Sequence, residues 1–84
     1  MDFDKTMQFK VEYESGAEPK QILQDVYDAL NEKGYDPINQ IIGYFLSGDP
    51  TYITSFKDAR SKIIQLERDE LLEAILIEYL GINK

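Results

Sequence analysis

Apolar and polar residues alternate near the start of the chain, where single polar residues separate Met7, Phe9, Val11 and Tyr13. A period of two is typical of a β-strand. No second segment alternates convincingly, and a single strand has unpaired backbone edges unless it lies on helices or pairs across a dimer. We therefore expect residues 1–18 to form an extended or disordered arm, mobile or loosely docked, that ends in a linker over residues 15–18.

The next pattern has a helical period. Pro19 suits the first turn of a helix, and Gly34 is typical of the residue that follows the end of one. Between them, apolar residues recur at helical spacing, at Ile22, Leu23, Val26, Tyr27 and Leu30. This spacing predicts an amphipathic helix over residues 19–33.

Asp36 and Pro37 predict the start of a second helix, because aspartate is a good N-cap and proline is favoured at the first helical position. Apolar residues cover nearly the whole circumference of this helix, at Ile38, Ile41, Ile42, Tyr44, Phe45 and Leu46. Such a helix is expected at the centre of the fold or in an interface. Gly43 lies inside it, where glycine costs about 1 kcal/mol relative to alanine, and this indicates close approach of another group to the backbone.

A turn at residues 47–50 repeats the chemistry of residues 34–37 and predicts about one helical turn through residues 52–53. A third helix is expected next, because Ser55 and Asp58 have the spacing of a helix start signal. Ala59, Ile63 and Leu66 then lie on one face of that helix.

A fourth helix is predicted after a break near Asp69, and Gly81 is expected to end it. It carries the strongest amphipathic pattern of the chain, formed by Leu71, Leu72, Ile75, Leu76, Tyr79 and Leu80. The pattern leaves open whether the third and fourth helices form one kinked helix. The chain is thus expected to be all-α, with a small bundle of about four helices over residues 19–84.

Size and charge narrow the range of partners. A chain of 84 residues and 9.7 kDa forms one small domain with a small core, so a self-associating surface would add to its stability. Its formal net charge of −7 disfavours nucleic acid and anionic membranes as partners. A basic or mixed-charge protein fits this surface better.

The absence of cysteine and histidine limits the chemistry. It excludes disulfides, thiolate nucleophiles, imidazole bases and the usual zinc sites. No apolar stretch approaches the roughly 20 residues that span a bilayer, and residues 1–5 do not resemble a signal peptide. We expect a cytoplasmic protein without a cofactor or a metal.

Two charged clusters remain. Acidic residues gather before the fourth helix, at Glu67, Asp69, Glu70 and Glu73. Their spacing matches no calcium loop, and a solvated helix junction explains them better than catalysis does. A local basic face at Lys57, Arg60 and Lys62 suits a phosphate or an acidic peptide, whereas the acidic net charge argues against a DNA-binding helix-turn-helix.

The sequence resembles the IreB family over nearly its whole length. The matching segments are FDKTMQF at residues 3–9, YDAL at 27–30, KGYDPINQI at 33–41, LSGDPTYI at 46–53, DAR at 58–60 and LERDE at 66–70. The resemblance implies a small, non-enzymatic regulatory phosphoprotein of the Gram-positive cytoplasm. Its kinase would be a transmembrane Ser/Thr kinase with extracellular PASTA repeats, opposed by a cognate phosphatase, in cell-envelope stress and cephalosporin-resistance signalling.

The resemblance also implies specific sites. Thr6, which lies in the charged arm and is sterically open to a modifying enzyme, matches the position that the family phosphorylates. Asp4 stands where some members have a second threonine. A homodimer of helical subunits is implied as well, and its candidate interface residues are Ile38, Ile42, Gly43 and Phe45. Replacing Gly43 by leucine is expected to weaken self-association.

The leading hypothesis is a phospho-switch at Thr6. A phosphate adds about −1.5 to −2 charges and three strong acceptors. It would either dock on Lys57, Arg60 or Lys62, or be repelled by the acidic body so that the arm is released. The alternative is a constitutive acidic interaction module, a dimeric adaptor that binds a basic protein regardless of phosphorylation. The downstream protein is not identified by the sequence.

Overall fold

The computed structural model describes residues 18–82. The elements are α2 (Pro19–Glu32), α3 (Pro37–Ser47), the 3₁₀ turns η2 (Pro50–Tyr52) and η3 (Phe56–Asp58), α4 (Ala59–Ile63) and α5 (Arg68–Leu80). Four α-helices without a strand confirm the predicted all-α class for this part of the chain. The strand-like segment predicted over residues 6–14 lies outside the described residues.

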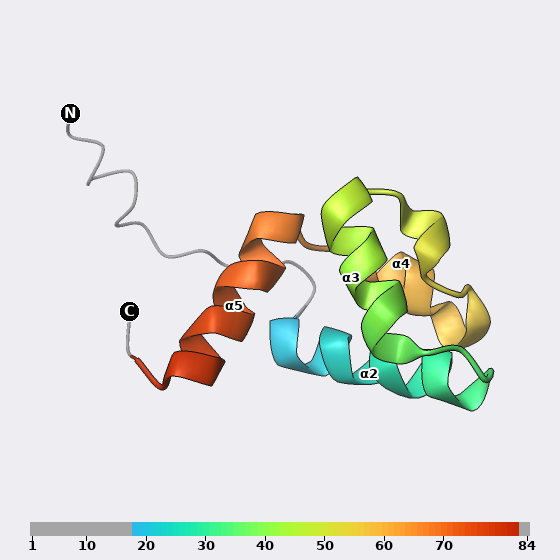
Figure 1. Ribbon diagram of the computed structural model, residues 1–84, viewed down its shortest axis with the longest axis horizontal. Coiled ribbons are helices and arrows are strands. Elements are labelled where there is room, and N and C mark those ends of the chain that lie inside the picture. Colours follow the sequence, from blue (N-terminus) through green and yellow to red (C-terminus); the bar gives the residue numbers. More distant parts are fainter. Residues whose placement is uncertain (1–17, 83–84) are drawn as a thin grey trace.

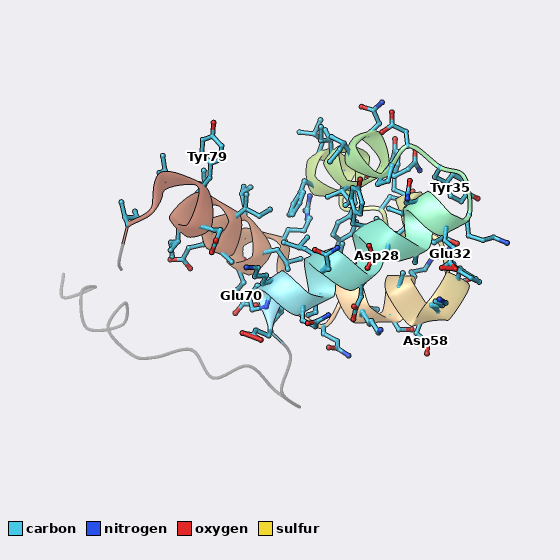
Figure 2. All side chains as sticks on the ribbon, turned by 90° about the horizontal axis from the view of Figure 1, so that it is seen from below. Asp28, Glu32, Tyr35, Asp58, Glu70 and Tyr79 are labelled. Atoms are coloured by element: carbon cyan, nitrogen blue, oxygen red, sulfur yellow. The ribbon has the colours of Figure 1, made fainter. Side chains whose placement is uncertain are left out.

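Helix α2 connects the fold, because it packs against α3, α4 and α5. Helices α3 and α4 both lie near its C-terminal half (Figure 1), on opposite sides of α2 as Figure 2 shows, and α5 leads away from them at the other end of α2. The interior is one cluster formed by Ile22, Val26, Ala29, Leu30, Tyr44, Ile53, Ala59, Ile63, Leu66 and Leu71. The α2 members recur at helical spacing, as predicted, and α5 contributes a single side chain.

The predicted ends of the first two helices are confirmed. Pro19 is the first residue of α2, and Gly34 follows the helix with φ of +88°, a conformation that glycine adopts without strain. Asp36 caps α3, where its Oδ1 accepts a hydrogen bond from the Asn39 backbone N–H at 3.3 Å. The predicted single turn after Gly48 is the 3₁₀ turn η2.

The third helix differs from the prediction at its start. The Ser55 side chain makes no capping hydrogen bond, and η3 precedes an α-helix that begins only at Ala59. Lys57 and Asp58 have positive φ values of 53° and 61°, which a continuous right-handed helix does not allow. The Thr54 hydroxyl accepts from the Phe56 N–H at 3.2 Å and holds the chain in this turn.

The fourth helix ends before Gly81, as predicted. It is separate from the third, which the sequence left open, and the break lies at residues 64–67 and not near Asp69, which is inside α5. The burial of this helix was predicted wrongly. Of the six apolar residues assigned to its buried face, Leu71 is the one that is buried. Leu72, Leu76, Tyr79 and Leu80 are exposed. The reason is tertiary, since α5 meets the body through its first turn and then diverges from it (Figure 1).

Candidate functional site

An open apolar groove lies between α2, α3 and α5, with a volume of about 810 Å³. Its apolar lining consists of Pro19, Leu23 and Tyr27 of α2, Ile38 and Ile41 of α3, and Ala74, Ile75 and Tyr79 of α5. Glu18, Lys20, Gln24 and Glu78 add a polar margin. A concave apolar surface with a charged edge is typical of a binding site.

The path of α5 creates this groove. Leu71 anchors the helix in the core, and the Glu70 side chain accepts a hydrogen bond from the Glu67 backbone N–H at 2.8 Å, which fixes the start of the helix. Its main helix partner is α2, and its C-terminal half stands clear of α3 in Figure 1. Tyr79 is 84% exposed and projects from the end of the helix in Figure 2.

A second apolar surface is the outer ridge of α3. Ile38, Ile42 and Leu46 recur every fourth residue, so they share one side of the helix, and they are 57%, 47% and 81% exposed. Of the predicted interface residues, Ile38 and Ile42 thus lie together on this ridge. Phe45 instead packs partly buried against the core, and its carbonyl accepts from Arg68 Nη1 at 2.8 Å.

Gly43 faces a different neighbour. A Cβ atom built on it would overlap the ring of Tyr52 in the same chain. The Tyr52 carbonyl in turn accepts from Gln40 Nε2 at 2.9 Å, which holds η2 against α3. The close approach that the sequence predicted is therefore confirmed, and an intramolecular packing contact explains it. A leucine at position 43 would disturb this packing as well as any dimer.

Gly43→Ala is expected to lower the free energy of unfolding by about 1 kcal/mol, because the Tyr52 ring must move. In a Tyr52→Ala background the same change is expected to raise it by up to about 1 kcal/mol, since alanine is the better helix residue. Urea unfolding of the four chains in this double-mutant cycle measures the coupling. Equal effects of Gly43→Ala in both backgrounds would show that the ring does not restrict this position.

The three predicted basic residues all have partners within the chain. Lys57 Nζ lies 3.1 Å from Glu32 Oε1, and Lys62 Nζ lies 3.1 Å from Asp25 Oδ2. Arg60 Nε donates to the Ile53 carbonyl at 2.8 Å. These contacts fasten η3 and α4 to α2 and to the preceding turn. A phosphate that docks here has to compete with two carboxylates.

The contacts of the Asp25 carboxylate predict that its contribution to the free energy of unfolding depends on pH. This carboxylate accepts from Gln21 Nε2 at 2.8 Å and from Lys62 Nζ, and these bonds lower the pKa of Asp25 below its ordinary value of 3.8. A carboxyl with a depressed pKa stabilises the folded state above its ordinary pKa and loses this contribution as the pH falls through the lowered value. Asp25→Asn is therefore expected to cost at most about 1 kcal/mol at neutral pH, because both side chains are about one-third exposed.

Urea unfolding at neutral pH and again well below pH 3.8 checks this prediction. The difference between the two chains is expected to shrink at the lower pH, where the wild-type carboxylate becomes protonated. Asp28→Asn is the matched control, since Asp28 accepts a similar bond from Gln24 but no cation pairs with it in the described structure. A pH-independent difference for Asp25→Asn would contradict the assignment.

The predicted acidic cluster lies at the start of α5 and not before it. Asp69 and Glu70 occupy its first turn, where negative charge interacts favourably with the helix dipole. Among residues 18–82, no group of three or more carboxylates is placed so that it could hold a metal ion. No helix in the same range is both long and apolar enough to cross a membrane.

The predicted phosphorylation site, Thr6, lies outside the described residues. The groove was not predicted from the sequence, although one signal for it was present. Apolar residues of α5 recur at almost every position from Leu71 to Ile77, which is more than one buried face requires. A helix of this kind needs either deep burial or a partner.

Comparison with known proteins gives consistent matches. Residues 4–81 match the family model described as "IreB regulatory phosphoprotein". A protein named UPF0297 from Ruminiclostridium cellulolyticum is 60% identical over 80 residues, which cover 95% of this chain and 91% of that protein. A UPF0297 protein from Acetivibrio thermocellus is 61% identical over 80 residues, covering 95% of this chain and 89% of the relative.

Proposed function

The chain belongs to the IreB family of regulatory phosphoproteins, and on that premise we propose that it is a non-enzymatic cytoplasmic regulator switched by phosphorylation of Thr6. The kinase is a transmembrane Ser/Thr kinase of the PASTA type, opposed by its cognate phosphatase. The pathway is cell-envelope stress and cephalosporin-resistance signalling. The family match carries this proposal, because it begins at residue 4 and so includes the threonine of the arm.

The contacts of the other two threonines of the chain, Thr51 and Thr54, support Thr6 as the phosphorylation site. The Thr51 hydroxyl donates to Asp49 Oδ1 at 2.7 Å, and that carboxylate also accepts from the Thr51 N–H at 3.0 Å. A phosphate on Thr51 would remove the donor and place like charges together. The Thr54 hydroxyl holds the turn before η3. Modification of either residue would therefore disturb the fold.

The phosphate acts through its charge. It adds about −1.5 to −2 charges next to a body that is already acidic. Docking on Lys57 or Lys62 would require the phosphate to displace Glu32 or Asp25, whereas repulsion requires no such exchange. The contacts of these lysines therefore favour the route in which phosphorylation releases the arm.

The regulator acts as a homodimer in this proposal. The α3 ridge supports self-association, because Ile38, Ile42 and Leu46 form an exposed apolar strip on one helix. Exposed apolar side chains of α5, including Leu76 and Leu80, offer further surface that a partner chain could cover.

The test is incubation of the full chain with the kinase domain of a PASTA-type kinase, followed by intact mass measurement and fragment sequencing. The expected result is one phosphate, located at Thr6 and absent from Thr6→Ala. Thr51→Ala serves as the control and should be modified like the wild type. Phosphate elsewhere, or none at all, would overturn the switch and leave a constitutive acidic interaction module.

A further inference from the structure

The N-terminal arm enters the described structure at the edge of the apolar groove. Glu18, Pro19 and Lys20 are the first described residues, and all three line the groove. Pro19 is buried, so the point at which the arm joins the body is fixed. Any segment a few residues before Glu18 is thus tethered at the opening of this surface.

The arm has the length and the chemistry to fill the groove. Residues 14–17 span at most about 14 Å when extended, which brings Tyr13 within reach of the lining. An extended segment of residues 7–13 is about 23 Å long, and α5, which forms one wall, is about 20 Å long. The alternation of Met7, Phe9, Val11 and Tyr13 presents one apolar side over this whole length.

We propose that residues 7–13 dock in the groove of their own chain, with the alternating apolar side against Leu23, Ile41 and Ile75. The tether favours this occupant over a second copy, because a short linker gives an effective concentration in the millimolar range. The polar side of the segment then faces solvent, and Thr6 lies next to the docked region. The inference concerns the unmodified chain and does not depend on phosphorylation of Thr6.

Paramagnetic relaxation measured by NMR tests the docking in the full chain. The sequence contains no cysteine, so Gln8→Cys carries a single nitroxide on the polar side of the segment without removing an apolar contact. The expected result is broadening of backbone amide signals of α5 around Ile75 and of α3 around Ile41. Amide signals around Ser61, on α4, are expected to stay sharp.

Three variants of the labelled chain make the result specific. Phe9→Asp is expected to abolish the broadening, whereas Glu12→Gln, on the polar side, is expected to preserve it. Tyr79→Ser changes the lining of the groove instead of the arm, and it should weaken the broadening. Because Tyr79 is 84% exposed, this variant is expected to keep the fold, and its helix content measured by circular dichroism checks this.

A mixing experiment distinguishes docking within one chain from docking between two chains. Spin-labelled chains without ¹⁵N are combined with ¹⁵N chains that carry no label, so broadening can arise only between molecules. Docking within one chain predicts sharp signals in this mixture. Strong intermolecular broadening in the groove would show a partner's arm or a second copy there, and uniform broadening over the whole surface would show no docking. Either result overturns the proposal, and neither bears on whether the kinase modifies Thr6.

Discussion

Replacing Leu71 by alanine is expected to lower the free energy of unfolding by about 2–4 kcal/mol. Leu71 is fully buried, and within α5 no other residue is buried. The substitution removes apolar contacts and leaves a cavity at the point where α5 meets the core. A domain of this size has a total stability of only several kcal/mol, so the variant should lose much of its resistance to urea.

Leu72→Ala is the matched control, because it makes the same chemical change one position further along the same helix. Leu72 is 45% exposed, and its replacement is expected to cost less than about 1 kcal/mol. Urea unfolding followed by circular dichroism measures both. Similar losses for the two variants would mean that α5 is anchored by its outer face, and the description of the groove would then be wrong.

Local signals account for the part of the fold that was predicted correctly. Pro19 and Asp36 act on the backbone within a few residues of themselves, so they define the starts of α2 and α3 without reference to the rest of the molecule. The buried face of α2 follows in the same way from the spacing of its apolar residues. Gly43 indicated a close approach, although the sequence did not identify Tyr52 as the neighbour.

The predictions that failed concern features that tertiary contacts determine, namely the start of the third helix and the burial of α5. Ser55 has the right residue type for a cap, but the positive φ values of Lys57 and Asp58 delay the helix until Ala59. The apolar residues of α5 were assigned to one buried face, yet they surround the helix and most remain exposed. No local pattern specifies where a helix leaves the body, and the direction of α5 is what opens the groove.

The candidate site likewise depends on tertiary contacts, which local sequence patterns do not specify. Lys57, Arg60 and Lys62 looked like an available basic face because the sequence could not show their partners on α2 and in the preceding turn. The groove combines the consecutive helices α2 and α3 with α5, which is distant in sequence, so it could not be predicted from any one of them. The proposed docking of the arm rests on the position of Pro19 at the edge of the groove, which the sequence does not reveal.

Ile42→Glu is expected to weaken the proposed dimer by about a hundredfold. Ile42 lies in the middle of the α3 ridge, between Ile38 and Leu46, so a carboxylate there would lose its hydration in a dimer interface. In a two-fold symmetric dimer the substitution occurs twice, and a penalty near 1.4 kcal/mol per copy multiplies to this effect. Analytical ultracentrifugation of wild type and variant over a range of concentrations gives the two dissociation constants.

The monomer itself should tolerate Ile42→Glu, because the side chain is 47% exposed and lies outside the core cluster. Helix content by circular dichroism is therefore expected to be unchanged, which separates loss of assembly from loss of fold. Ser61→Glu adds the same charge at an exposed position of α4 and controls for the general repulsion between two acidic chains. If both variants dissociate equally, charge alone is responsible, and if neither does, the ridge of α3 is not the interface.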